Sequence, residues 1–97
     1  MRDAAEATIL VTGATDGLGR RVARELAGMG ATVLLHGRSL ERLDDTLEAL
    51  RGETDSEKLH CYQADLSSLD EVRGLAERVL SEHDRLEVLV NNAGIIS

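Results

Sequence analysis

The sequence predicts an α/β fold, a doubly wound parallel sheet with helices on both faces. Short apolar runs alternate along the chain with longer segments in which apolar residues recur every three or four positions. The apolar runs start at residues 8, 31, 59 and 86, which are 23 to 28 residues apart and leave room for one helix after each of the first three. Strands joined by helices in this way are parallel, with right-handed connections.

The first two strands and the helix between them have clear boundaries. The run TILVTG, Thr8–Gly13, predicts a short buried strand, and ATVLLHG, residues 31–37, predicts the second. Gly28 and Gly30 should end the intervening helix. Its apolar face consists of Leu18, Val22, Ala23 and Leu26.

Two more helices and two more strands follow. Ser39 should cap a helix that ends at Gly52, and Ser68 with Glu71 fits a capping box at the start of a helix within residues 67–83. The apolar stripes are Leu40, Leu43, Leu47 and Leu50 in the first of these helices, and Leu69, Val72, Leu75, Ala76, Val79 and Leu80 in the second. The remaining strands are LHCYQAD, residues 59–65, and LEVLVNNAG, residues 86–94, which breaks at Asn91.

Composition and charge exclude several classes of function. A chain of 97 residues supports one domain with one core. Its net charge of −7 repels nucleic acid and anionic membranes, so we expect neither as a partner. Cys61 is the only cysteine, which excludes an internal disulfide and offers no metal-ligand spacing. No apolar run approaches the roughly 18 residues of a membrane span, and the acidic start lacks a signal-peptide core. We therefore expect a cytoplasmic protein without a metal site.

Three glycines, Gly13, Gly17 and Gly19, lie between the first strand and the first helix. A helix N-terminus presents unpaired N–H groups and the positive end of the helix dipole, and glycine lets a phosphate approach the backbone. The spacing G-x-x-x-G-x-G differs from the common dinucleotide fingerprint G-x-G-x-x-G. A nucleotide-phosphate site and a tight structural turn both remain open on this evidence.

Four motifs together resemble the short-chain dehydrogenase/reductase family. They are TGATDGLG, HGR, AD and NNAG, each at the carboxyl end of a predicted strand, where open α/β sheets bind ligands. The resemblance implies a Rossmann-like sheet in the order 3-2-1-4. It also implies that residues 1–97 are the NAD(P)-binding half of a longer family fold.

The resemblance also implies roles for individual residues. The pyrophosphate loop would comprise Thr12, Gly13, Gly17, Leu18 and Gly19. Asp65 would accept a hydrogen bond from the adenine amino group, and Leu66 would lie against the adenine ring. The residues that line the cofactor ribose would be Asn91, Asn92, Ala93 and Gly94. Other interpretations stay open. Asp65 could instead be the N-cap of the third helix, and the two asparagines could form an ordinary turn.

Arg38 and Ser39, at the end of the second predicted strand, favour NADP(H) over NAD(H). NAD enzymes place a carboxylate there to bind the ribose 2′-hydroxyl, whereas a guanidinium can bind a 2′-phosphate. Residues 36–39, His-Gly-Arg-Ser, contain no acid. Asp16 argues the other way, because relatives that prefer NADP often carry a basic residue in the glycine loop. The alternative for Arg38 is a solvated loop arginine.

No catalytic residue can be assigned. The family transfers hydride between the nicotinamide and a carbonyl or alcohol, using a Ser and a Tyr-x-x-x-Lys motif that lie C-terminal to NNAG. Tyr62 has Leu66 four residues later, so it does not fit, and we expect His36 and His60 to be structural. The resemblance implies an oxidoreductase whose catalytic half is not in these residues. The alternative is an inactive nucleotide-binding or assembly half-domain.

We also expect the chain to self-associate through Leu86–Val90.

Overall fold

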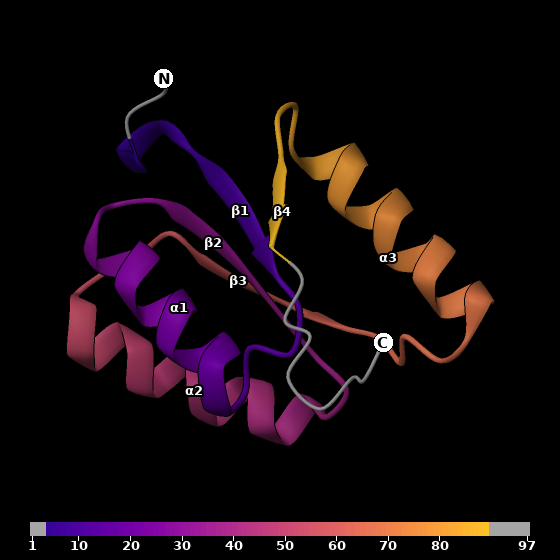
Figure 1. Ribbon diagram of the computed structural model, residues 1–97, viewed down its shortest axis with the longest axis horizontal. Coiled ribbons are helices and arrows are strands. Elements are labelled where there is room, and N and C mark those ends of the chain that lie inside the picture. The colour runs from indigo at the N-terminus through magenta and orange to yellow at the C-terminus, as the bar shows by residue number, and fades with distance from the viewer. Residues whose placement is uncertain (1–3, 90–97) are drawn as a thin grey trace.

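The computed structural model describes residues 4–89 and shows one parallel four-stranded sheet in the order β3-β2-β1-β4, as predicted. Helices α1 and α2 cover one face and α3 the other (Figure 1). The elements are a 3-10 turn, Ala4–Glu6, and then β1 Thr8–Val11, α1 Gly17–Gly28, β2 Thr32–Gly37, α2 Leu40–Thr54, β3 Leu59–Gln63, α3 Leu69–Glu82 and β4 Glu87–Leu89.

Alternation along the strands sends neighbouring side chains into two cores. In β1, Val11 packs toward α1 and α2, whereas Leu10 packs toward α3. The larger core, under α1 and α2, is built from Val11, Ala14, Ala23, Ala27, Ala31, Val33, Leu35, Leu43, Leu50 and Leu59. The smaller core consists of Leu10, Leu34, Tyr62, Ala64, Leu75 and Val79.

The predicted end of α2 is wrong. The helix continues past Gly52 to Thr54, and Asp55 takes the left-handed conformation (φ 58°) that ends it. The Asp55 N–H donates to the Arg51 carbonyl (2.9 Å), and the Thr54 hydroxyl donates to the Leu50 carbonyl (2.7 Å). Gly52 is tolerated because the backbone bonds continue through the residues after it. Leu40, predicted for the apolar stripe, is 64% exposed in the first turn of α2.

The predicted buried face of α3 is too wide. Leu75 and Val79 are buried and Val72 is half-buried, but Leu69, Ala76 and Leu80 are exposed.

The predicted capping box of α3 also forms only in part. The Ser68 hydroxyl accepts from the Glu71 N–H (3.3 Å), but the Glu71 carboxylate accepts from the Asp65 N–H (2.8 Å) and not from Ser68. The last residues of the fourth predicted strand lie outside the described part of the chain.

Candidate functional site

A cavity of about 650 Å³ opens at the carboxyl ends of β1, β2 and β3. Three loops and the first turn of α2 surround it. Its lining residues are Thr12, Gly13, Thr15, Asp16, His36, Gly37, Arg38, Ser39, Arg42, Ala64, Asp65, Leu66 and Ser67. Open α/β sheets bind their ligands at this edge, so the cavity is the candidate site.

The loop between β1 and α1 needs glycine at two positions. Gly13 (φ 62°) and Gly17 (φ 57°) are left-handed, a conformation that costs any residue with a Cβ. The Ala14 N–H donates to the His36 carbonyl (2.8 Å), which extends the β1–β2 pairing into the loop. The chain then enters α1 at Gly17, where the first N–H groups and the positive dipole end create a site for an anion.

His36 connects all three strand ends. It is buried, and its Nδ1 accepts a hydrogen bond from the Gly13 N–H (3.0 Å). Its Nε2 lies 2.9 Å from the Ala64 carbonyl oxygen, which can only accept, so Nε2 carries the proton. The neutral Nε2–H tautomer therefore fixes the glycine loop relative to the loop that contains Asp65.

Gly37 permits the glycine loop to lie close to β2. A Cβ on Gly37 would come within 2.8 Å of Thr15 Cγ2 and 3.1 Å of Leu43 Cδ2. Thr15 lines the cavity, and Leu43 is buried in the larger core. The glycine of the HGR motif is therefore required by close packing.

Two arginines and two aspartates supply the charge of the cavity. Arg38 is exposed directly after β2, and Ser39 caps α2 by accepting from the Arg42 N–H (3.3 Å). The Arg42 guanidinium donates to Asp16 Oδ2 at 2.7 Å, across the cavity mouth from α2 to the glycine loop. Asp16 therefore faces a positive charge and not open solvent alone.

Asp65 is held as a carboxylate at the end of β3. The Ser67 hydroxyl (2.7 Å) and the Ser67 N–H (3.0 Å) both donate to its Oδ1, and they hold the pKa of Asp65 below its ordinary value, with a smaller contribution from the positive charge of Arg38. Ser68 is the N-cap of α3, so Asp65 does not have that role.

The structure brings together most of the predicted residues within its described range. Thr12, Gly13, Arg38, Ser39, Asp65 and Leu66 line the cavity. Gly17, Leu18 and Gly19 form the first turn of α1, next to the glycine loop. Asn91, Asn92, Ala93 and Gly94 lie outside the described residues.

Sequence reasoning missed Arg42 as a site residue. It stands three positions after the N-cap Ser39, on the same face of α2, and this helical spacing was the available signal. Thr15 and Ser67 were also missed; they line the cavity next to residues that the motifs had identified.

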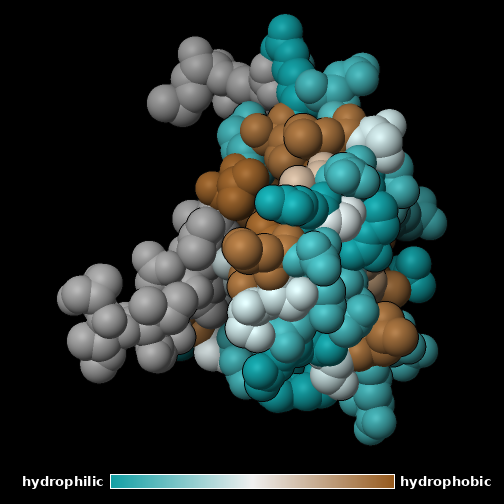
Figure 2. Space-filling view, turned by 90° about the vertical axis from the view of Figure 1, so that its right-hand side faces the viewer, coloured by the Kyte–Doolittle hydropathy of each residue, from teal (hydrophilic) through white to brown (hydrophobic). Residues whose placement is uncertain are grey.

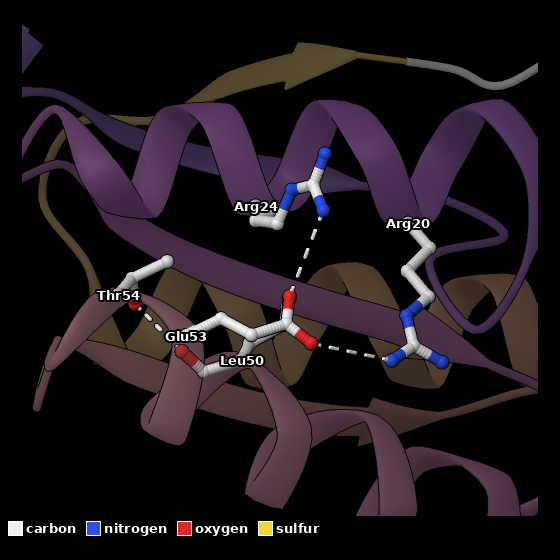
Figure 3. Close-up of polar contacts among 5 residues, drawn as sticks. All are labelled: Arg20, Arg24, Leu50, Glu53 and Thr54. Atoms are coloured by element: carbon white, nitrogen blue, oxygen red, sulfur yellow. Dashed lines mark hydrogen bonds and ion pairs between the residues drawn. The ribbon is translucent and has the colours of Figure 1, made fainter.

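A smaller hollow of about 250 Å³ lies between α1 and α2, and Gly17, at the start of α1, is one of its lining residues. Figure 3 shows Arg20 and Arg24 on α1 reaching toward Glu53 on α2, at 3.9 and 3.8 Å. All three side chains are at least 40% exposed. Exposed ion pairs of this kind contribute little to stability.

Tyr62 is a structural residue of the α3 side. It is buried on β3, its hydroxyl donates to the Glu82 carboxylate, and it lies 3.2 Å from His83 Nε2. Burial and the Glu82 carboxylate raise the pKa of Tyr62 to about 12, the reverse of what a general base requires.

Between residues 4 and 89, no group of three or more His, Cys, Asp or Glu side chains is arranged to hold a metal, and no helix is long and apolar enough to cross a membrane.

Known proteins with a similar sequence include dehydrogenases. Retinol dehydrogenase 13 of Homo sapiens is 36% identical over 89 residues, and dehydrogenase/reductase SDR family member 13 of Homo sapiens is 43% identical over 90 residues. These alignments cover 92% and 93% of this chain but only 27% and 24% of the relatives. The chain thus spans about a quarter of their length.

A solved structure shares the fold and holds a nucleotide. The short chain dehydrogenase from Shigella flexneri, complexed with NADP, superposes with a TM-score of 0.79 at 37% identity. The match covers 89% of this chain and 37% of that chain. The model of the short chain dehydrogenase family matches residues 7–97. This chain therefore belongs to the short-chain dehydrogenase/reductase family.

Proposed function

We propose that this chain is the NADP(H)-binding part, residues 1–97, of an oxidoreductase that transfers hydride between nicotinamide and a carbonyl or alcohol. The observation that carries the proposal is the cavity edge at the end of β2. There Arg38 is exposed, Ser39 follows it, and no carboxylate stands between His36 and Ser39. The solved relative complexed with NADP supports the same cofactor class.

The cofactor would lie across the carboxyl ends of the strands. Its pyrophosphate would contact the Gly13–Gly17 loop and the first turn of α1, where Leu18 and Gly19 present their N–H groups. The adenine amino group would donate to Asp65, which is ionised at neutral pH, with Leu66 beside the ring. Asn92, Ala93 and Gly94 would line the ribose on the nicotinamide side.

The preference for NADP(H) follows from charge. A guanidinium binds a phosphate through two parallel charge-assisted hydrogen bonds, whereas the ribose hydroxyl of NAD(H) needs a carboxylate partner. Asp16 opposes this preference less than its sequence position suggested, because Arg42 pairs with it. The names of the relatives, retinol dehydrogenase and polyprenol dehydrogenase, support an alcohol or carbonyl as the substrate class.

The test is the substitution Arg38→Asp. We expect it to weaken NADPH binding by about 1.5–3 kcal/mol, the contribution of a hydrogen bond to a charged group, while NADH binding is kept or improved. Titration calorimetry with both nucleotides measures this. Equal NADPH affinity in wild type and variant would contradict the role of Arg38.

The second candidate is a nucleotide-binding or assembly half-domain without turnover. The observation that favours it is that the one Tyr of these 97 residues has no Lys four positions later and is buried under α3. Exposed apolar side chains on α3 and β4 support self-association as part of either function. The half-buried free thiol of Cys61 suits a reducing, cytoplasmic compartment.

A further inference from the structure

Asp16 occupies the position from which a side chain most readily blocks the phosphate site. It is the N-cap residue of α1, with an extended backbone (φ −156°, ψ 174°) that suits an N-cap. Aspartate is among the preferred N-cap residues because its carboxylate accepts hydrogen bonds from the second or third N–H of the helix. Those positions of α1 are Leu18 and Gly19, the N–H groups that a pyrophosphate would use.

In the structure, the carboxylate of Asp16 does not cap α1 and instead pairs with Arg42. It makes no cap hydrogen bond with α1, and its Oδ2 accepts from Arg42 Nη2 at 2.7 Å. Arg42 itself is anchored by the start of α2, where its N–H donates to Ser39. The two helix starts are thus joined by this ion pair, and the anion-binding end of α1 is left without a capping carboxylate.

We propose that Arg42 is a positioning residue that holds the Asp16 carboxylate off the N-terminus of α1 and so keeps the phosphate site open. The inference rests on the proposed nucleotide function but concerns the phosphate region common to NADH and NADPH. Without the guanidinium, the Asp16 carboxylate turns to the N–H groups of Leu18 and Gly19. A nucleotide then has to displace an internal anion.

The chain offers a matched control in Arg24. Arg24 and Arg42 are both exposed arginines that link α1 to α2 through a carboxylate, at 3.8 Å to Glu53 and 2.7 Å to Asp16 (Figure 3 shows the Arg24 pair). Arg24 does not line the cavity. Arg24→Gln therefore removes the same charge and a similar helix–helix contact without freeing Asp16.

The experiment measures the dissociation constants of NADH and NADPH by titration calorimetry for wild type, Arg42→Gln, Arg24→Gln, Asp16→Ala and the double variant Arg42→Gln/Asp16→Ala. We expect Arg42→Gln to weaken both nucleotides alike, by about three- to tenfold, the range that a competing N-cap hydrogen bond would produce. Asp16→Ala in the same chain should restore both affinities, because alanine neither caps nor repels. Arg24→Gln should stay within about twofold of wild type.

An NMR measurement gives a readout without nucleotide. In Arg42→Gln the amide protons of Leu18 or Gly19 should exchange more slowly with solvent than in wild type, since the Asp16 carboxylate protects them.

Three outcomes of the calorimetry overturn the inference. Arg42→Gln could weaken NADPH binding alone, which would assign Arg42 to the 2′-phosphate. Asp16→Ala could fail to restore the affinity of Arg42→Gln, or Arg24→Gln could lose as much affinity as Arg42→Gln. If wild type binds neither nucleotide, the proposed function has failed. If Arg38→Asp leaves the preference for NADPH unchanged, only the assignment of NADP(H) as the preferred cofactor has failed.

Discussion

His36 joins the three loops of the cavity, and its sequence context did not reveal how. Its partners Gly13 and Ala64 are 23 and 28 residues away, and both contacts use backbone groups, which no side-chain motif records. Arg38, Ser39 and Asp65 could be predicted because each follows a strand end in a recognisable motif. The pairing of Arg42 with Asp16 could not, because it depends on how two helix starts meet in space.

Gly37 gives the sharpest test of local packing at the cavity. Gly37→Ala places a Cβ about 2.8 Å from Thr15 Cγ2, so the glycine loop or Leu43 must move. We expect a loss of about 1–3 kcal/mol in the free energy of unfolding, typical of overpacking, together with weaker NADPH binding. Urea unfolding followed by circular dichroism measures the first effect, and calorimetry measures the second.

Gly52→Ala is the control for that substitution. Gly52 lies in α2 with nothing within 4 Å of the added Cβ, so the same chemical change should stabilise the protein by about 0.5–1 kcal/mol through helix propensity. Equal effects of the two substitutions would show that close packing at Gly37 is not important.

Among the elements, α3 departs most from its sequence pattern. Six apolar positions predicted one buried face, but only Leu75 and Val79 are fully covered by the sheet. Leu69 (75% exposed) and Leu80 (65% exposed) remain at the surface. Periodicity records which side chains share a face of the helix, but not how much of that face its neighbours cover.

The exposed apolar side chains gather on the side of the molecule that α3 and β4 form. Figure 2 shows hydrophobic side chains over this face, and Leu80 on α3 and Val88 on β4 are each more than half exposed. β4 is also the last strand in the sheet order. Strands at a sheet edge and apolar patches of this kind recruit other chains, and the net charge of −7 opposes contact only over a screened distance of about 8–10 Å.

We therefore expect the 97-residue chain to self-associate through this face. Light scattering at ordinary salt should give a mass at least twice the 10.5 kDa of one chain, and Leu80→Lys should lower it. Leu40→Lys is the matched control, because Leu40 is equally exposed (64%) but lies on α2, on the opposite face of the sheet. A stable monomer at high concentration would contradict the prediction, as would an equal effect of both lysines.

For the molecule as a whole, the parallel pairing could be predicted because strands and helices alternate along the chain, whereas the order 3-2-1-4 also needed the family resemblance. Element ends were less predictable. The carboxyl-terminal residues of the first and third predicted strands, among them Thr12, Ala64 and Asp65, belong to loops. These are the residues that line the cavity, so the ends of the elements matter more for function than their centres.

We expect these 97 residues alone to oxidise no NADPH. Their one tyrosine is buried, its pKa is raised to about 12, and it has no lysine four residues later, so this tyrosine is not placed to protonate a carbonyl. The absorbance of NADPH at its reduced-nicotinamide band, followed with a panel of aldehydes and ketones, measures this. Steady oxidation by homogeneous material of this length would contradict the expectation.

The central claim, that the cavity at the ends of β1, β2 and β3 binds the 2′-phosphorylated nucleotide, is tested most directly by mapping the bound ligand. Adenosine 2′,5′-bisphosphate is titrated into isotope-labelled protein, and backbone amide shifts are followed by NMR. We expect the largest changes at Gly13, Arg38, Ser39 and Asp65, with much smaller changes for adenosine 5′-monophosphate. Changes centred on Arg20, Arg24 and Glu53, or no saturable change, would contradict the account.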